Sequence, residues 1–365
     1  MLTHHSSEDY NTAAKKASDN AKQKLEQLIE KGRDRAMNVV SKVLSTTIND
    51  QLVSGKAMHF GLKDAEIIMK PENSQEGNSL HTKALYQATG RADIPSAYTT
   101  HLLGNTTYGK DLLVHNLNTI YGNTTDRFLT RSVEGQIRGF LSDRFRRLDS
   151  RPIIESFAKA CKNTGALAVE GYSLDTKLMI KAVLPVIYEP VPNEVLAMGV
   201  VLENSDFGHG ALSVRTFCLR LWYTNFAIAE ENMRKVHLGS RLDDVSFFSQ
   251  TTHEFDTKTI ASAIHDTVSH QLGEAKIESF LAAIKKANEE KIDPKQVSAY
   301  LSKRFTADDK KEIVSAFNSP DVENLPAGNT NWRLSNAISW IANQKSDEEE
   351  KIDFMKEAGK ILAVK

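Results

Sequence analysis

The sequence lacks most features that mark secreted, membrane or disulfide-stabilised proteins. Its 365 residues include two cysteines, Cys161 and Cys218, which are too few for a disulfide framework or a four-ligand zinc site. No run of 18 apolar residues occurs, so we expect no spanning helix and no membrane partner. The polar N-terminus, MLTHHSSEDYNTAAKK, lacks the apolar segment of a secretory signal. We therefore expect a cytoplasmic protein.

The chain also lacks an excess of one charge. It carries 46 Lys and Arg residues against 47 Asp and Glu residues, a formal net charge of −1. This balance excludes a protein that is basic over its whole surface. It does not exclude nucleic-acid binding, which requires only a local basic patch.

The apolar pattern divides the chain into three regions. Residues 1–50 are expected to form an N-terminal amphipathic helical segment, residues 51–255 a mixed α/β core domain, and residues 256–365 a helical C-terminal region. The apolar stripe of the first region consists of Ala21, Leu25, Leu28, Ala36, Val39 and Val43. This stripe packs either on the main domain or on a neighbouring subunit, and the second case implies a homo-oligomer through the N-terminal helix.

Period-two patterning predicts a central, mostly antiparallel sheet within residues 176–223. Alternation is clear in residues 177–184 and 212–221, and residues 195–202 are continuously apolar. Residues 104–126 are rich in Asn, Gly and Thr, which is typical of turns and loops. The expected class is α+β, a sheet with helices followed by the helical C-terminal region.

The segment RSVEGQIRGFLSDRFRRLDSR, residues 131–151, is the main functional candidate. Apolar residues recur every three or four positions, so we predict an amphipathic helix over residues 131–149. Arginine suits bidentate contact with phosphate. The candidate nucleic-acid-binding residues are Arg131, Arg138, Arg144, Arg146, Arg147 and Arg151, with Lys177 and Lys181 on the sheet as additions. Alternatively, Asp143 and Asp149 pair with these arginines in a structural salt network.

Aromatic residues could stack on the bases of a single strand. Five lie near the arginine segment or at the end of the last predicted strand: Tyr108, Tyr121, Phe128, Trp222 and Tyr223. The alternative role for all of them is core packing.

Signs of catalysis are few. The loop of residues 203–215 contains Gly208 and Gly210, but the sequence has neither a Walker loop nor a GxGxxG motif, so a hairpin connection is expected there. The histidines show no metal-binding spacing, and we identify no catalytic residue, metal site or cofactor site. A nuclease would need a metal-binding acid cluster. The acids available for it are Glu203, Asp206, Asp143 and Asp149.

Several segments together resemble a broad family of uncharacterised proteins carried by phages, plasmids and other mobile elements, which share a domain of unknown function. The similar segments are residues 81–103, 130–150, 201–228, 234–239 and 329–342. The chain departs from the family pattern at Tyr223 and Phe226, where cysteine and glycine are expected. The resemblance implies a mobile-element setting rather than an activity.

These observations favour a nucleic-acid-binding protein of a phage or other mobile element, acting on single-stranded DNA in replication, recombination or annealing. The second hypothesis is a non-enzymatic protein that inhibits or titrates a host factor, such as a defence component. It would act through the N-terminal helix or the helical C-terminal region. An enzyme is the third and least supported reading.

Overall fold

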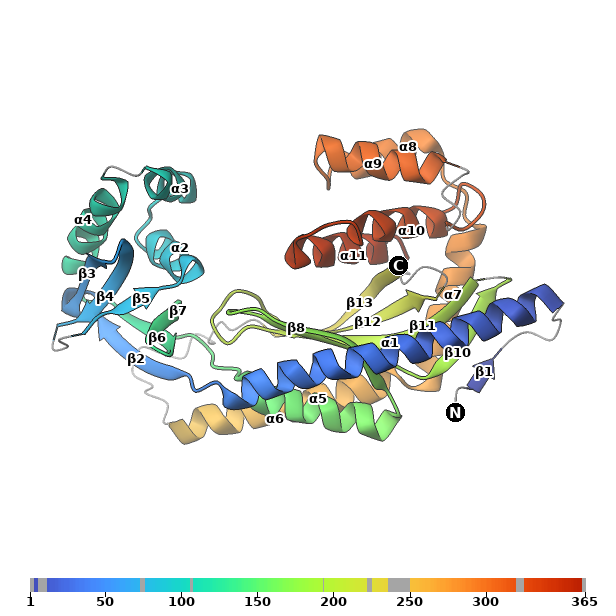
Figure 1. Ribbon diagram of the computed structural model, residues 1–365, viewed down its shortest axis with the longest axis horizontal. Helices are drawn as coiled ribbons and strands as arrows, with labels where there is room; N and C mark the ends of the chain where they lie inside the picture. The colour runs from blue at the N-terminus through green and yellow to red at the C-terminus, as the bar shows by residue number, and fades with distance from the viewer. Residues whose placement is uncertain are drawn as a thin grey trace.

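Two β-sheets organise the chain, and each carries its own layer of helices (Figure 1). The structure is a computed structural model that describes residues 3–5, 12–72, 76–105, 108–192, 194–221, 225–235, 250–319 and 325–362. We call the unit built from residues 49–145 the first lobe, and the unit formed by the remaining described residues the second lobe. The core domain expected over residues 51–255 therefore holds two sheets with separate hydrophobic cores.

The first lobe contains a six-stranded sheet of order β2-β6-β7-β5-β4-β3. Its strands are β2 (Asn49–Ser54), β3 (Met58–Lys63), β4 (Glu66–Pro71), β5 (Asn78–Leu80), β6 (Arg127–Val133) and β7 (Gln136–Ser142). One face packs against the helices α2 (Thr82–Arg91), α3 (Ser96–Gly104) and α4 (Gly109–Gly122). The core between them includes Leu85, Leu117 and Phe140.

The second lobe contains a seven-stranded sheet in which only β1 and β10 pair in parallel. Its strands are β1 (Thr3–His5), β8 (Leu167–Ser173), β9 (Leu178–Val183), β10 (Val186–Val191), β11 (Glu194–Asn204), β12 (Leu212–Arg220) and β13 (Asn225–Lys235). The mostly antiparallel sheet predicted within residues 176–223 is thus confirmed, as is the α+β class.

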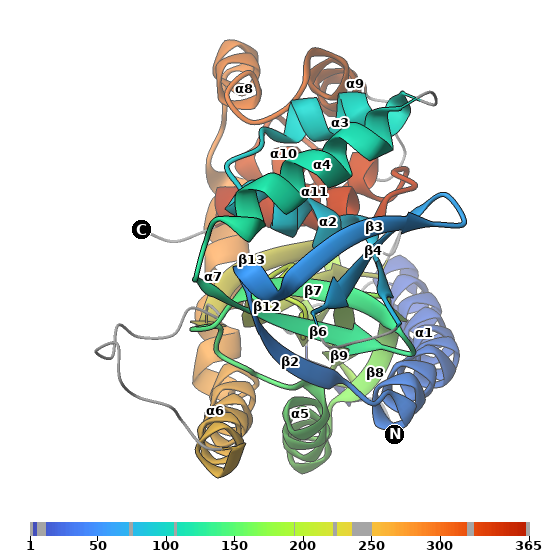
Figure 2. The ribbon, with the colours of Figure 1, turned by 90° about the vertical axis from the view of Figure 1, so that its left-hand side faces the viewer.

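Helices cover both faces of this sheet. Alternate residues of its strands therefore pack into two different hydrophobic cores. Met198 and Val200 pack towards α5 (Ser150–Thr164), α6 (Gln250–Gln271) and α7 (Glu274–Glu289). Ala197 and Val201 pack towards the opposite layer. That layer consists of α8 (Pro294–Leu301), α9 (Ala307–Asn318), α10 (Asn331–Ala342) and α11 (Glu348–Leu362). Figure 2 shows α5 and α6 side by side below the sheet.

The N-terminal helix α1 (Thr12–Ser45) lies along β8 at the edge of the second-lobe sheet (Figure 1). Ala21 and Leu25 are buried in one core and Ala36 and Val39 in the other. The apolar stripe is therefore used within the chain, as the first of its two readings predicted. Gly32 permits this contact, because a Cβ there would lie 2.1 Å from the carbonyl carbon of Val169.

The helix predicted over residues 131–149 is wrong: β6 and β7 form a hairpin there. Glu134 and Gly135 make its turn, with φ of 49° and 78°, the left-handed values that tight hairpin turns require. Arg138 is an extra residue in β7, because Arg131 pairs with Gly139 while Ser132 pairs with Ile137. This bulge puts residues three apart on one face, which imitates helical spacing.

The loop predicted over residues 104–126 is also wrong, since α4 occupies most of it. Leu113, Leu117 and Tyr121 are spaced four residues apart and all three are buried against the first-lobe sheet. Burial of this stripe outweighs the low helix propensity of the surrounding Asn, Gly and Thr residues. No helix within the described ranges is both long enough and apolar enough to cross a membrane.

Gly32→Ala should destabilise the protein by about 3 kcal/mol, because the added methyl group has no space between the α1 and β8 backbones. Gly90→Ala is the matched control: this helical glycine in α2 has nothing within 4 Å of its missing Cβ. The control should gain about 1 kcal/mol from helix propensity. Urea denaturation of both variants measures these differences, and equal stabilities would contradict the close α1–β8 packing.

Candidate functional site

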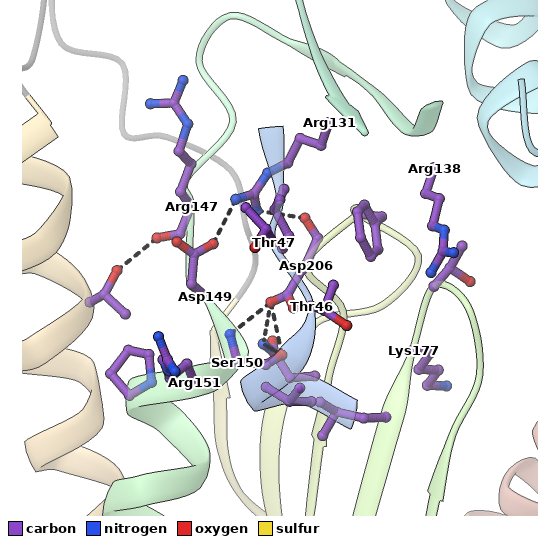
Figure 3. A pocket seen from close by; sticks show the side chains of 18 of the residues that line it. Thr46, Thr47, Arg131, Arg138, Arg147, Asp149, Ser150, Arg151, Lys177 and Asp206 are labelled. Carbon is purple, nitrogen blue, oxygen red and sulfur yellow. Dashed lines mark hydrogen bonds and ion pairs between the residues drawn. The ribbon is translucent and has the colours of Figure 1, made fainter. Parts of the chain in front are cut away.

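A cleft of about 540 Å³ lies where the two lobes meet (Figure 3). Its walls are the C-terminal end of α1, β2, the β6–β7 hairpin, the start of α5, the β8–β9 turn, the β11–β12 loop and the start of α6. Five of the predicted nucleic-acid-binding residues line this cleft: Arg131, Arg138, Arg147, Arg151 and Lys177. They are brought together by strands and loops rather than by one helix.

Arg131 is buried at the bottom of the cleft, with 2% of its side chain exposed. Its Nε donates to Asp50 Oδ1, its Nη2 to Asp149 Oδ1 and its Nη1 to the carbonyl oxygen of Asp206, each at 2.7 Å. Burial opposes its charge, but the carboxylates of Asp149, Asp50 and Asp206 outweigh this and raise its pKa. Arg131 therefore stays charged and ties three separate segments together.

Asp50 serves two arginines. It stands opposite Arg131 in the β2–β6 register, and its second carboxylate oxygen lies 2.6 Å from Arg147 Nε. The structural salt network left open as an alternative is thus present around Arg131 and Arg147. Asp149 belongs to it, as expected, and Asp50 takes the place expected for Asp143.

Asp206 closes the network from the β11–β12 loop. Its Oδ1 accepts hydrogen bonds from the backbone nitrogen and the hydroxyl of Ser150, both at 2.8 Å, and so caps the first turn of α5. Burial raises the pKa of Asp206 to about 6, against the lowering effect of the nearby Arg131 charge. The sequence offered no signal for this capping role, because the two residues are 56 positions apart.

The rest of the β11–β12 loop joins the lobes. Gln87 of α2 donates to the carbonyl oxygen of Phe207 at 2.9 Å. His209 Nε2 lies 3.2 Å from the carbonyl oxygen of Arg138 and must carry the proton, since a carbonyl only accepts. Burial lowers the pKa of His209 to about 4, so the ring is neutral at pH 7.

The same loop needs a glycine at position 208. Gly208 has φ of 76°, and a Cβ there would lie 2.5 Å from Leu141. The expected hairpin connection is confirmed, and it also forms the contact between the lobes.

The cations at the mouth of the cleft are held less tightly. Arg138 Nη1 is 3.3 Å from the carbonyl oxygen of Asp175, and its buried Nε has no hydrogen-bond partner among the described residues. Lys42 Nζ is 3.6 Å from Asp175 Oδ1, and Arg151 Nη2 donates to the carbonyl oxygen of Leu44 at 3.4 Å. Lys177 and Lys258 also lie at this rim, where Lys42, Arg151 and Lys258 are exposed and Arg138 and Lys177 are partly buried.

Basic side chains outnumber acidic ones along the cleft. The lining holds seven cations, Lys42, Arg131, Arg138, Arg147, Arg151, Lys177 and Lys258, against five carboxylates, Asp50, Asp149, Asp175, Asp206 and Glu254. The N-terminal end of α5 adds the positive end of its helix dipole, which Asp206 partly offsets. The arrangement suits a multiply charged anion such as a chain of phosphates. Sequence reasoning missed Lys42 and Lys258, which lie far from the arginine segment.

Three predicted residues lie elsewhere. Arg146 forms a bidentate pair with Asp256 of α6. Lys181 is buried on the opposite face of the second-lobe sheet, with its Nζ 2.6 Å from Glu170 Oε2. Arg144 is exposed on the connection between β7 and α5 and does not line the cleft. Lys181 is therefore a structural residue. Its alternation with apolar residues suggested a solvent-facing position, but β9 is buried on both faces.

The acids proposed for a metal-dependent nuclease do not meet. Asp149 and Asp206 line the cleft, but Glu203 lies on the opposite face of the sheet with its Oε2 2.7 Å from Arg215 Nη1. Asp143 is exposed on the β7–α5 connection. Among the described residues, no group of three or more His, Cys, Asp or Glu side chains is placed to hold a metal ion.

The aromatics proposed for base stacking are mostly used elsewhere. Tyr121 and Phe128 pack edge to face, with ring centroids 5.1 Å apart, inside the first-lobe core. Tyr108 is exposed at the start of α4, away from the cleft lining. Trp222 and Tyr223 lie outside the described residues.

Comparison with protein-family models, curated proteins and solved structures finds no match for the chain. The resemblance to mobile-element proteins therefore stays a prediction, and the site has to be interpreted from its own geometry.

Arg131→Ala should lower the free energy of unfolding by about 3 kcal/mol, because two carboxylates and a carbonyl lose a buried donor. Arg131→Lys should recover less than half, since one ammonium cannot reach three acceptors. Arg151→Ala, at an exposed position of the same cleft, should change stability by no more than about 0.5 kcal/mol. Equal losses at both positions, measured by urea denaturation, would show that Arg131 has no special structural role.

Asp206 should also give the protein a distinct pH dependence of stability. Because its pKa rises from 3.8 to about 6 on folding, the folded state holds this proton more tightly than the unfolded state. Its contribution to stability is therefore largest at low pH and is lost as pH rises towards 6. The unfolding free energy of the wild type, relative to Asp206→Asn, should fall between pH 4 and 6 by up to about 1.4 kcal/mol per pH unit. Parallel pH profiles of the two proteins would contradict the raised pKa.

Proposed function

We propose that the cleft binds the phosphate backbone of a nucleic acid. The observation that carries this proposal is the convergence of Lys42, Arg138, Arg151, Lys177 and Lys258 from five separate elements on one open cleft. The cations predicted from sequence divide into two roles. Arg131 and Arg147 hold the walls together through Asp50, while the side chains at the rim supply the charge that a ligand meets.

The geometry of the rim supports phosphate as the ligand. The guanidinium of Arg138 is only weakly engaged, because its Nη1 lies 3.3 Å from the carbonyl oxygen of Asp175 and 3.9 Å from Asp175 Oδ1. A guanidinium in this state can give two parallel hydrogen bonds to phosphate oxygens. Lys177 and Arg151 stand on either side of the cleft in Figure 3, so successive phosphates could be contacted across it. Such contacts position a strand without reading its sequence.

The alternative role, inhibition or titration of a host protein, rested on the N-terminal helix and the C-terminal helical region. Both use their apolar faces within the chain. The apolar stripe of α1 is buried against the second-lobe sheet of the same chain. The C-terminal helices α9, α10 and α11 use their apolar faces to cover the opposite side of that sheet. A homo-oligomer through α1 has the same difficulty. The cleft therefore supports nucleic-acid binding better.

The biological setting is a further part of the proposal. A protein that holds phosphate backbones without reading their sequence suits replication, recombination or annealing of DNA. The resemblance to phage and plasmid proteins would place it in the cytoplasm of a host cell.

Removing the rim cations should weaken binding and reduce its salt dependence. For the triple variant Arg138→Ala, Arg151→Ala, Lys177→Ala, the slope of log affinity against log salt concentration should drop by about 2 to 3, close to one per lost phosphate contact. Fluorescence anisotropy with a labelled oligonucleotide between 50 and 300 mM salt measures both quantities.

Lys311→Ala is the matched control, because this lysine is exposed on α9 and does not line the cleft. It should leave affinity and slope unchanged. Absence of binding by the wild type at the lowest salt concentration would overturn the proposed function. So would a triple variant whose affinity and slope match those of the control.

A further inference from the structure

An exposed aromatic ring stands at the edge of the cleft. Phe255, in the first turns of α6, has 63% of its surface exposed, although phenylalanine is ordinarily a core residue. Its neighbours Glu254, Thr257 and Lys258 line the cleft. Lys258 Nζ lies 5.7 Å from the centre of the Phe255 ring. The ring and the cation therefore form one small surface beside the phosphate-binding rim.

A second apolar side chain stands across the cleft. Leu174, in the turn between β8 and β9, is 41% exposed and lines the cleft close to Lys177. Figure 3 shows the cleft open between α6 on one side and the β8–β9 turn that carries Lys177 on the other. Leu174 thus lies on one wall close to Lys177, and Phe255 lies beside the other wall next to Lys258. That pairing fits a ligand that alternates flat apolar groups with charged ones.

Nucleic acids differ in whether they present such groups. In a duplex the faces of the bases are stacked on each other, and a protein at the backbone meets phosphates, sugars and base edges. In a single strand the faces are free, and stacking of a base on an aromatic ring contributes binding energy irrespective of base identity. A lysine beside the ring places a charge where the adjacent phosphate would lie.

We infer that the cleft takes a single strand, with one base stacked on Phe255, the adjacent phosphate on Lys258 and further phosphates on Arg151, Arg138 and Lys177. This inference rests on the proposed function and specifies its substrate class. Phe255 acts as a stacking platform, and the cations fix the path of the strand. Duplex nucleic acid can reach the rim cations but leaves the ring without a partner.

The test compares wild type and Phe255→Ala for binding to a labelled oligodeoxythymidine of 15 nucleotides and to a duplex of the same length. Loss of one stacked base should weaken single-strand binding about 10-fold and leave duplex binding within about two-fold. Phe255→Trp should keep or improve single-strand affinity. An oligonucleotide of abasic residues has no base to stack on Phe255, so it should bind wild type and Phe255→Ala equally.

Tyr108→Ala is the matched control, because Tyr108 is 65% exposed but lies at the start of α4, a helix that contributes no residue to the cleft lining. It should bind both ligands as the wild type does. Three results overturn the inference while leaving the proposed function standing: equal single-strand affinity of Phe255→Ala and wild type, equal losses for single strand and duplex, or tighter wild-type binding to duplex. If the wild type binds neither ligand, the proposed function itself fails, and the inference falls with it.

Discussion

The buried guanidinium of Arg131 is the interaction on which the arrangement of the two lobes depends. It satisfies Asp50 on β2, Asp149 before α5 and the carbonyl oxygen of Asp206 in the β11–β12 loop. A buried charge is costly unless it is paired and fully hydrogen-bonded, so these partners must hold their positions whenever the protein is folded. One side chain thereby holds together a strand of the first lobe, the start of a helix in the second lobe and the β11–β12 loop of the second lobe.

The same network leaves the arginine-rich cleft with only part of its positive charge paired to carboxylates. The inner cations Arg131 and Arg147 are matched by the carboxylates of Asp50 and Asp149. The outer cations lie at the rim, where their contacts with acidic groups are longer. Arg138 shows how the backbone contributes, because the bulge in β7 turns its side chain towards the cleft while its carbonyl binds His209. Loosely held cations around a paired inner network suit a ligand that is recognised by its charge.

Much of the second lobe could be predicted from the sequence, and much of the first could not. Residues 177–184 and 212–221 were recognised as strands from their apolar and β-branched residues, although both faces of these strands are buried. The β6–β7 hairpin was missed since its bulge and its two-sided burial reproduce a helical repeat. The site was partly found, as the arginine segment does reach the cleft. Its carboxylate partners Asp50 and Asp206 could not be assigned, because contacts between residues 75 or 81 positions apart leave no pattern in a single sequence.

The packing of α1 on β8 has a consequence for the solution behaviour of the protein. Among the described strands, β8 is the last on its side of the second-lobe sheet and pairs with β9 alone. An uncovered edge of this kind presents free peptide groups that can recruit a strand from another molecule and start aggregation. Because Gly32 and Gly171 let the helix and strand backbones approach closely, α1 shields this edge along its length. The helix thus blocks the addition of a strand from another molecule at this edge. This effect does not depend on a ligand in the cleft.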